Sequence, residues 1–487
     1  MAEGKFSPTR RRLIVGALAA GAGLYVAARL AGSRDTTAGN GAMSDTGYAD
    51  AWVEIRTDGR IVLRLTEAEM GQGVTTSLPL LVAEELAVAP DTIELAPAPL
   101  TPVYGEQTTG GSTSIREAWP VLRRSAATAR ALLITAAAAR WGVDDADCRA
   151  ADGHVHHDPS GRSLAYGALA LDAARLEPPA EVALTEPGEW RWIGHSPPRR
   201  DVPEKLTGTA VFGIDINRRG ALVASVAHPP VPGGEPVRMD TRAARAVAGV
   251  QDVLTLPGGA VAVVADGYWE ARQGLDALAP EWPPAGLPDD TAIAAILEEA
   301  LDGDMPTAWQ RGEADGGNVA GDALVSARYR VPLQAHACLE PPNATAAAGD
   351  DGIEVWTGTQ SRSRARDAAL AAARGEGPGA LLARVAGRLG LATGNDVSVH
   401  GTLIGGGFGR RLEQDYVTEA VALSRTVGAP VKVIWSREED LRHDVYRPPS
   451  HHLLEARLGA DELPQSWHHR IAAPSVVESL WPGSVTD

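Results

Sequence analysis

Short alternating runs of apolar and polar residues begin near residue 51. The runs 52–56 and 61–65 alternate in this way and flank the turn dipeptide Asp58-Gly59, which predicts a β-hairpin. Residues 78–86 are an apolar run, and residues 117–141 are rich in Ala, Leu and Arg, so we expect one short and one long helix there. The first part of the chain should therefore combine a small sheet with helices.

The same two patterns recur along the rest of the chain. Strands are predicted at 222–227, 250–256, 260–264, 323–331, 353–357, 396–404 and 431–435. Helices are predicted at 240–248, 269–278 and 412–427. This mixture indicates an α+β chain, and at roughly 150 residues a domain its length favours about three domains.

Composition places the expected domain boundaries. A Trp- and Pro-bearing connector at 188–200 should separate a first region, 48–187, from an α+β domain at 201–285. Residues 286–320 carry many Gly and Asp and predict a second connector at the surface. Residues 321–487 form the last region.

Residues 1–32 have the pattern of an export signal. Consecutive arginines at 10–12 precede an uncharged run rich in Ala and Gly, which is typical of a twin-arginine signal. An ordinary secretory signal and a retained N-terminal membrane anchor are the alternatives, although Arg29 weakens a simple spanning helix. We expect a periplasmic protein in which residues 33–47 form a linker.

Charge and cysteine content narrow the chemistry. Lys and Arg number 45 against 62 Asp and Glu, a net charge of −17, so no nucleic-acid partner is expected. Cys148 and Cys338 are the two cysteines, which excludes a disulfide framework, an all-cysteine zinc site and a cysteine-ligated iron–sulfur cluster within the chain. A redox role therefore needs a bound cofactor of another kind or a partner.

Two glycine-bearing segments precede the two predicted helices. In Gly71-Gln72-Gly73 the side-chain amide of Gln72 both donates and accepts, which suits recognition of a heterocycle edge. The loop Thr109-Gly110-Gly111-Ser112-Thr113-Ser114 can bind phosphate, or it can be an N-cap in which Ser114 and Glu117 form a capping box. Each segment alone fits a ligand site or a scaffold equally well.

A third glycine segment lies between a predicted strand and a predicted helix. Gly405-Gly406-Gly407-Phe408-Gly409 removes side chains from that corner, so the backbone can take positive φ and contact a ligand. Arg410 and Arg411 follow, and they can bind an anion or cap a face. The spacing fits neither the GxGxxG fingerprint nor a phosphate loop. Gln360 ends another strand, where ligand-binding side chains commonly project.

Together these segments resemble the molybdenum-binding subunits of the xanthine dehydrogenase and aldehyde oxidase family, most closely the isoquinoline 1-oxidoreductase beta subunit type. The resemblance is carried by MGQGVTT at 70–76, TTGGSTSIREAW at 108–119, DVPEKLTGTAVFGIDI at 201–216, HACLEPPNATA at 336–346, WTGTQ at 356–360, GGGFGRRLEQDYVTEAV at 405–421 and PVKVIWSREEDLRHDVYRP at 430–448. It covers nearly the whole chain after the signal.

The resemblance implies a molybdopterin cofactor in its cytosine dinucleotide form, with molybdenum held through the pterin rather than by protein ligands. It implies that Gly71, Gln72, Gly73 and the loop Thr109–Ser114 contact the pterin or dinucleotide. It further implies that Gln360 approaches an oxo ligand and that Gly407-Phe408-Gly409 approaches the metal centre. Gly406 and Arg410 complete the implied site, and 201–285 should be hammerhead-like.

The implied reaction is hydroxylation of an N-heterocycle or an aldehyde, with water as the oxygen source. Because this chain cannot ligate a cluster, the resemblance implies a small [2Fe–2S] subunit that takes the electrons and a periplasmic cytochrome c as a further acceptor. The identity of the small-molecule substrate stays open.

The family's general base is a glutamate in a Gly-rich motif near the C-terminus of a further domain. No GxGE motif follows residue 409, and the sequence stops at Asp487, so we expect an incomplete last domain. Either a separate C-terminal fragment supplies the glutamate or the chain is a truncated product. We interpret Glu340 as structural and Glu413 as a first-turn helix carboxylate, and we assign no base.

Two other functions are weighed against the hydroxylase. An exported cofactor-binding or assembly protein would keep the fold without the chemistry, and the missing glutamate supports it. A nicotinamide or flavin oxidoreductase rests on the glycine loop alone and lacks the expected fingerprint.

Overall fold

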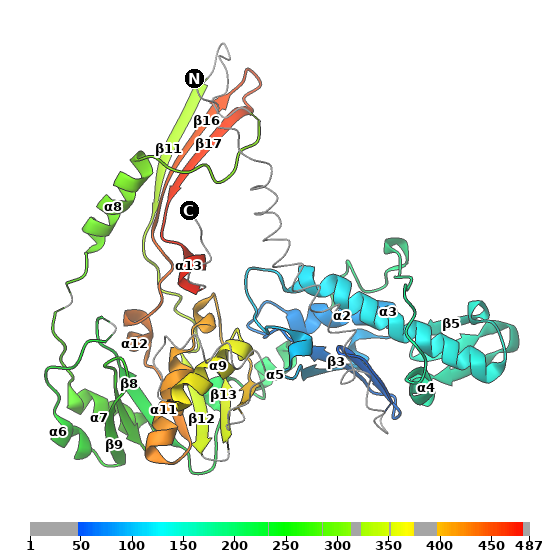
Figure 1. Cartoon of the computed structure of the whole chain (residues 1–487), viewed down its shortest axis with the longest axis horizontal. Coiled ribbons are helices and arrows are strands. Elements are labelled where there is room, and N and C mark those ends of the chain that lie inside the picture. Colours follow the sequence, from blue (N-terminus) through cyan, green and yellow to red (C-terminus); the bar gives the residue numbers. More distant parts are fainter. Residues whose placement is uncertain are drawn as a thin grey trace. The chain divides into compact units, whose positions relative to one another are not determined.

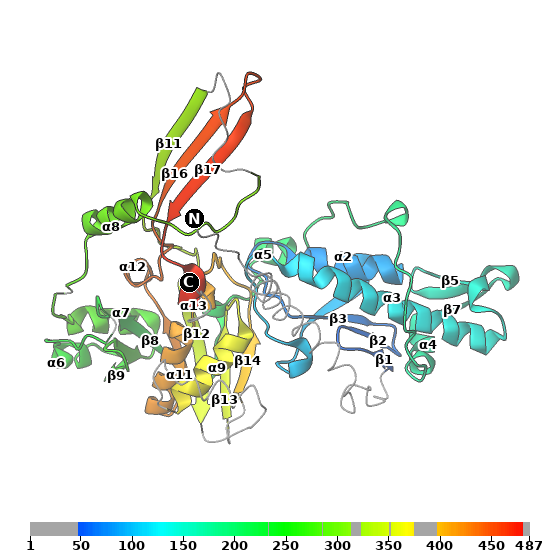
Figure 2. The same ribbon diagram turned by 45° about the horizontal axis from the view of Figure 1, so that its top comes forward.

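The computed structural model describes residues 47–231, 233–284, 286–312, 323–349, 352–374 and 397–480. Their contacts divide the chain into two units that are each discontinuous in sequence, 1–223 with 342–434 and 224–341 with 435–487. Figures 1 and 2 show the elements in two views. The signal segment, almost all of the linker and the last seven residues lie outside the described residues. The domain boundaries drawn from composition stay predictions.

The first unit begins with a sheet of strand order β1-β2-β3-β4. Its strands are β1 (Gly47–Ala49), β2 (Val53–Arg56), β3 (Ile61–Leu65) and β4 (Ile93–Pro97). The antiparallel pairing of β2 with β3 confirms the predicted hairpin, and β4 lies parallel to β3. The buried side chains of β2 and β3 share one hydrophobic core with α2 (Val74–Leu86) and α3 (Ser114–Trp141), so both predicted helices are confirmed.

A small antiparallel sheet extends this region. It has the order β5-β6-β7, from β5 (Cys148–Ala151), β6 (His154–His157) and β7 (Arg162–Ala165), and α4 (Tyr166–Ala173) follows. Val155, Tyr166 and Leu169 join the core shared by α2 and α3. The sheet is therefore packed onto the helices rather than forming a core of its own.

Residues 183–205 form a strap along α2. The carboxylate of Glu84 accepts hydrogen bonds of 2.7–3.0 Å from the backbone N–H groups of residues 191–193. Glu85, which is fully buried, accepts a 3.0 Å bond from the Thr185 N–H. Because the strap has little regular structure before α5 (Val202–Thr207), these carboxylates of α2 fix its path.

The rest of the first unit contains the strand order β14-β13-β12-β15. The strands are β12 (Asn343–Gly349), β13 (Gly352–Thr357), β14 (Val397–Gly401) and β15 (Val431–Ile434). α11 (Asp415–Val427) packs on β12 and β15, and α9 (Arg362–Ala373) packs on β14 and on α11. β12 was not predicted, because Asn-Ala-Thr-Ala-Ala-Ala-Gly offers little of the β-branched signal of a strand.

The second unit has two parts. One part contains the strands β8 (Leu222–Ala227), β9 (Val250–Thr255) and β10 (Val261–Ala265) and the helices α6 (Thr241–Arg245) and α7 (Tyr268–Leu278). The boundary between the units falls within β8, so its residues from Ala224 onward belong to this unit. The other is the sheet β11-β16-β17, from β11 (Ala323–Val331), β16 (Ser450–Leu458) and β17 (Pro464–Ala472). The short helices α12 (Arg437–Arg442) and α13 (Val476–Leu480) also belong to this unit.

The connector expected at 286–320 contains a helix, α8 (Asp290–Asp302). Its apolar residues Ile293, Leu297 and Leu301 recur at helical spacing and pack against Leu453 and Ala472 of the β16–β17 hairpin. Glycines at either end of the segment obscure this pattern in the sequence. The mixed architecture confirms the α+β class. None of the helices in the described ranges is both long and apolar enough to cross a membrane.

The buried ion pairs of Glu85 should contribute to the stability of the first unit. Glu85 contacts Arg123 at 2.6 Å and Arg130 at 3.0 Å, so Glu85→Ala leaves two guanidinium groups of α3 without this counter-charge. We expect a loss of about 3 to 5 kcal/mol in the free energy of unfolding, measured by denaturant titration. Asp158→Ala, which removes an exposed pair with Arg149, is the control and should leave the midpoint unchanged. Equal midpoints for both variants would contradict the role of Glu85.

Candidate cofactor site

Four loops of the first unit meet around the buried side chain of Gln360, at 66–73, 105–113, 358–361 and 402–412. The Gln360 Oε1 accepts a 3.0 Å hydrogen bond from the Gly409 N–H, and its Nε2 donates a 2.8 Å bond to the Thr109 carbonyl. The backbone adds a 2.7 Å bond from Thr109 N–H to the Gln360 carbonyl and a 3.0 Å bond from Gln360 N–H to the Arg411 carbonyl. Gln360 thus ties two of the predicted glycine loops together.

The first loop joins the same junction through its backbone. The Ala68 N–H donates to the Thr109 hydroxyl at 2.8 Å, and the Ile404 N–H donates to the Glu69 carbonyl at 3.1 Å. The structure therefore brings together all three predicted glycine segments and Gln360. We call this set of four loops the Gln360 junction.

The third glycine segment is crowded where the loops meet. A Cβ on Gly407 would lie 2.5 Å from the Met70 sulfur and 2.7 Å from the Gln360 Oε1. Gly406, Phe408 and Gly409 have φ values of 104°, 52° and 103°, and the Phe408 side chain is exposed. The bare corner is needed for packing of the loops, independently of any ligand.

The Thr109–Ser114 loop enters α3 without the predicted capping box. The helix begins at Ser114 itself, with Thr113 as its N-cap, and no side chain caps it. The Thr113 hydroxyl donates back to the Gly110 carbonyl at 3.3 Å instead, while Gly111 and Ser112 take positive φ. The capping-box alternative for Ser114 and Glu117 is therefore wrong, and the positive end of a 28-residue helix faces this loop.

The Gly71-Gln72-Gly73 loop is built around the buried carboxylate of Glu69. This carboxylate accepts hydrogen bonds from the N–H groups of Gly71, Gly73 and Thr75 at 2.9, 3.0 and 3.1 Å, and from the Thr75 hydroxyl at 2.8 Å. α2 starts directly after Gly73, so a negative charge sits at the positive end of the helix, which is favourable.

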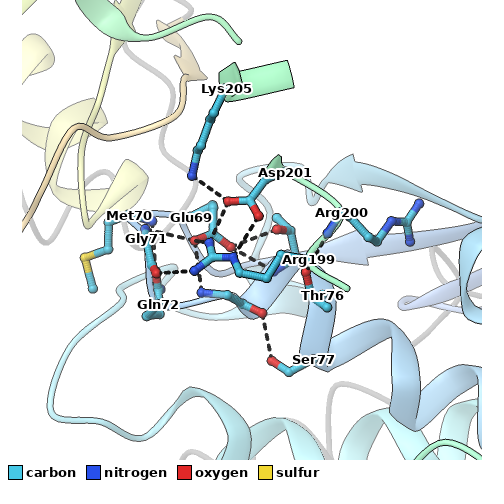
Figure 3. Close-up of polar contacts among 12 residues, drawn as sticks. Glu69, Met70, Gly71, Gln72, Thr76, Ser77, Arg199, Arg200, Asp201 and Lys205 are labelled. Carbon is cyan, nitrogen blue, oxygen red and sulfur yellow. Dashed lines mark hydrogen bonds and ion pairs between the residues drawn. The ribbon is translucent and has the colours of Figure 1, made fainter. Parts of the chain in front are cut away.

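Arg199 of the strap contacts both this carboxylate and the loop (Figure 3). Its guanidinium bonds to Asp201 at 2.9 and 2.6 Å, donates to the Gly71 carbonyl at 2.6 Å, and lies 3.4 Å from Glu69. The hydrogen bond from Arg199, aided by Lys205 of α5, holds the pKa of the Asp201 carboxyl well below its usual range. The Asp201 carboxylate therefore stays ionised at neutral pH.

The side chain of Gln72 closes its own loop. Its Oε1 accepts from the Met70 N–H and its Nε2 donates to the Ala68 carbonyl, both at 2.8 Å. Gln72 and Gly71 are exposed, so the loop presents a surface to solvent. Recognition of a heterocycle edge by Gln72, and the approach of Gln360 to a metal ligand, stay predictions.

The two arginines that follow the third glycine segment contact other residues of the protein. Arg410 and Arg411 lie in a short 3₁₀ turn, and both are buried. Arg410 forms a two-pronged pair with Asp415 at 3.1 and 2.7 Å, and the Arg411 guanidinium lies 5.3 Å from the ring centre of Tyr416. These contacts hold the turn against α11.

The expectation for Glu413 is wrong. α11 begins at Asp415, with Gln414 in the N-cap position, so Glu413 precedes the helix instead of lying in its first turn. Burial raises the pKa of the Glu413 carboxyl, and the charge of Asp415 adds to the effect. Glu340 is buried in the second unit.

Sequence reasoning missed Glu69, Arg199 and Asp201. A carboxylate immediately before a glycine loop and a helix is a recognisable capping signal. The charge cluster Arg199-Arg200-Asp201 in an otherwise Trp- and Pro-bearing connector was a second available signal. Neither indicates the partner, because Glu69 and Arg199 are 130 residues apart.

Comparisons with known proteins fit this junction. Two sequence profiles for a "Molybdopterin cofactor-binding domain" match residues 11–219 and 298–464. The first match contains the loops at 66–73 and 105–113, and the second contains Gln360 and the loop at 402–412. The junction therefore joins residues from both matched regions.

Two curated relatives match nearly the whole chain. Isoquinoline 1-oxidoreductase subunit beta of Brevundimonas diminuta is 31% identical over 515 residues, which cover 93% of this chain and 63% of that protein. The membrane-bound aldehyde dehydrogenase [pyrroloquinoline-quinone] of Gluconacetobacter polyoxogenes is 28% identical over 466 residues, covering 92% and 56%. Among solved structures, quinoline 2-oxidoreductase from Pseudomonas putida 86 is 19% identical with a TM-score of 0.39, covering 55% of this chain and 39% of that chain.

The chain is thus a molybdopterin-binding subunit, and it belongs to the xanthine dehydrogenase and aldehyde oxidase family. It spans less than two thirds of the length of the two curated relatives it matches.

The crowding at Gly407 generates a second prediction. Gly407→Ala displaces the Gln360 amide, which cannot move without losing its bonds to Thr109 or Gly409. We expect a loss of about 1 to 3 kcal/mol in stability, measured by denaturant unfolding. Gly349→Ala, at the end of β12, adds the same methyl group where no heavy atom lies within 4 Å. A Gly407→Ala protein as stable as this control would show that the junction is not tightly packed.

Glu413 generates a prediction of pH dependence. Its folded-state pKa lies above the ordinary value of 4.5, so ionising it disfavours the folded state once the pH rises above that value. We expect Glu413→Gln to raise the unfolding midpoint near neutral pH and to lose this advantage below about pH 4. Glu117→Gln, at an exposed position, controls for the loss of a formal charge. A gain that is constant with pH would contradict burial of the Glu413 carboxyl.

Proposed function

We propose that this chain is the molybdenum-cofactor subunit of an exported hydroxylase. The proposed reaction is oxidation of an N-heterocycle or an aldehyde with water as the oxygen source. One observation carries the proposal: the Gln360 junction gathers glycine-rich loops from both molybdopterin-matched regions within one unit. The matching relatives are named for an N-heterocycle and for aldehydes.

The residues of the junction suit a large ligand rich in oxygen and nitrogen. Hydroxyls and backbone N–H groups of 109–114 lie at a helix start, which favours phosphate oxygens, and Gly71 and Gln72 lie at an exposed part of the first loop. We propose that these two loops hold the pterin and a cytosine dinucleotide, and that the backbone of 406–410 lies next to the metal. When bound, the cofactor supplies two-electron redox chemistry that no side chain provides.

The protein groups of the junction have positioning roles in this proposal. Gln360 sets the distance between the 109–114 and 406–410 loops, because its side-chain amide bonds to one backbone group of each loop. Glu69 holds the Gly71-Gln72-Gly73 loop at the start of α2. Since both side chains are occupied in this way, neither is assigned as the general base.

We propose that electrons pass from the cofactor to a small [2Fe–2S] subunit and then to a cytochrome c. The support for this path is that Cys148 and Cys338 are both buried and unbridged, too few thiols for a cluster. The general base is proposed to be a glutamate of the complete enzyme, on this or a companion polypeptide, because the relatives are longer than the matched stretch.

The proposal also includes export to the periplasm by a twin-arginine-type route, with the N-terminus as a cleaved signal or a retained anchor. Its support is the sequence pattern of consecutive arginines ahead of an uncharged run. A route that carries folded proteins suits a chain whose ligand site joins distant segments.

A cofactor-binding protein without hydroxylase activity is the second candidate. It is favoured because the carboxylates of Glu69 and Asp201 already accept several hydrogen bonds from the protein. Neither carboxylate is therefore placed to take a proton from a substrate. The two candidates differ in one measurable respect, the reduction of an electron acceptor when the cofactor is present.

The test uses the complex purified from its native host with its companion chains. We expect stoichiometric molybdenum by elemental analysis, a fluorescent pterin after oxidation, and reduction of an artificial dye by isoquinoline or by an aliphatic aldehyde. Naphthalene, which lacks the ring nitrogen, is the matched inert compound. Molybdenum without dye reduction by either substrate class assigns the second candidate, and material with neither molybdenum nor pterin overturns the proposal.

A further inference from the structure

We propose that Arg199 is a positioning residue that locks the Gly71-Gln72-Gly73 loop in the geometry in which it receives its ligand. The identity of that ligand rests on the proposed function above. The lock itself rests on the contacts around the guanidinium, which Figure 3 shows between the loop and the strap.

One guanidinium connects three partners. It donates a 2.6 Å bond to the Gly71 carbonyl, lies 3.4 Å from the Glu69 carboxylate, and binds Asp201 through two nitrogens at 2.9 and 2.6 Å. Two of these partners belong to the loop and one belongs to the strap. Arg199 therefore fastens a loop at the start of α2 to a segment about 130 residues further along the chain.

Glu69 holds the N–H groups of the loop and the Gln72 amide bonds within it, whereas the Gly71 carbonyl is held by Arg199. Gly71 and Gly73 have φ values of 105° and 92°, and ordering glycine in one conformation carries a large entropy cost. Gly71 and Gln72 are exposed, and no apolar side chain of 71–73 can anchor the loop in a core. A charged hydrogen bond to the Gly71 carbonyl is the kind of contact that can offset this cost.

The position of Gly73 indicates that the guanidinium lies against bare backbone. A Cβ on Gly73 would sit 3.9 Å from the Arg199 guanidinium carbon. The Glu69 carboxylate, which accepts from the N–H groups of Gly71 and Gly73, lies 3.4 Å from the same guanidinium. The loop is thus bonded at its N–H groups by an anion and at the Gly71 carbonyl by a cation.

Asp201 orients the cation. Its carboxylate is buried, binds Arg199 through both oxygens, and is also paired with Lys205 of α5. A fork of two parallel bonds fixes the plane of a guanidinium, which an ammonium group cannot reproduce. The strap therefore presents Arg199 to the loop in one orientation.

Hydrogen exchange of the full chain tests the lock directly. In Arg199→Gln the amides of residues 66–77 should exchange on the order of tenfold faster than in the unaltered protein, as expected for loss of a charged hydrogen bond. Arg191→Gln is the matched control, because it lies in the same strap, removes the same charge and breaks an exposed 3.5 Å pair with Asp152 and a 5.6 Å cation–π contact with Trp192, neither of which involves the loop. Its exchange over 66–77 should be unchanged.

Three further variants separate positioning from general damage. Arg199→Lys keeps the charge but cannot form the fork, so its exchange should fall between the unaltered protein and Arg199→Gln. Added methylguanidinium should slow exchange of 66–77 in Arg199→Ala and should have no effect in Arg191→Ala. Exchange over 66–77 in Arg199→Gln equal to that of the Arg191 control overturns the proposal, as does failure of methylguanidinium to slow it in Arg199→Ala.

Molybdenum content of the natively assembled complex tests the consequence of the lock. We expect Arg199→Gln to retain severalfold less molybdenum per chain than Arg191→Gln. Faster exchange with full molybdenum retention shows that the lock is not needed for the ligand and overturns the positioning role. If the unaltered complex contains no molybdenum, the proposed function fails, and the exchange data alone then decide the lock.

Discussion

The site depends on the two hydrogen bonds made by the side chain of Gln360. A buried amide can satisfy a carbonyl and an N–H at once, and here these groups belong to the loops at 105–113 and 402–412. Leaving either group unpaired in a buried place costs more than the bond itself contributes. The bare corner at Gly407 follows from this constraint, because the amide and the Met70 sulfur occupy the space that a side chain would need.

α2 organises the other side of the junction along its whole length. Glu69 lies at its start, and Glu84 and Glu85 lie in its last turn, where they hold the strap by its backbone. The strap then returns to the start of the helix and delivers Arg199 to Glu69. Acidic groups within α2 and just before it thus fix a glycine loop that has no apolar anchor of its own, while the core beneath is built from the hydrophobic face of the same helix.

Local patterns in the sequence predicted local structure well and long-range contacts poorly. The β2–β3 hairpin and α3 follow from alternation and from helix-forming composition, and the glycine run at 405–409 correctly marked a bare corner. β12 was missed because its Ala-rich sequence has little intrinsic preference for a strand, and its pairing with adjacent strands decides its conformation. The Arg199–Glu69 contact was missed because no local pattern specifies a partner 130 residues away. The capping box failed for a related reason: packing of the loop, rather than the cap residues alone, sets where α3 begins.

The bond between Gln360 and Thr109 spans 251 positions of the chain. Closing so long a segment is entropically unfavourable until other contacts have formed. During synthesis, the ribosome must release the chain past Leu412 before the last of the four loops can take its place. The Gln360 junction therefore assembles late, only after the segments that contain Thr109, Gln360 and the loop at 402–412 have all been made.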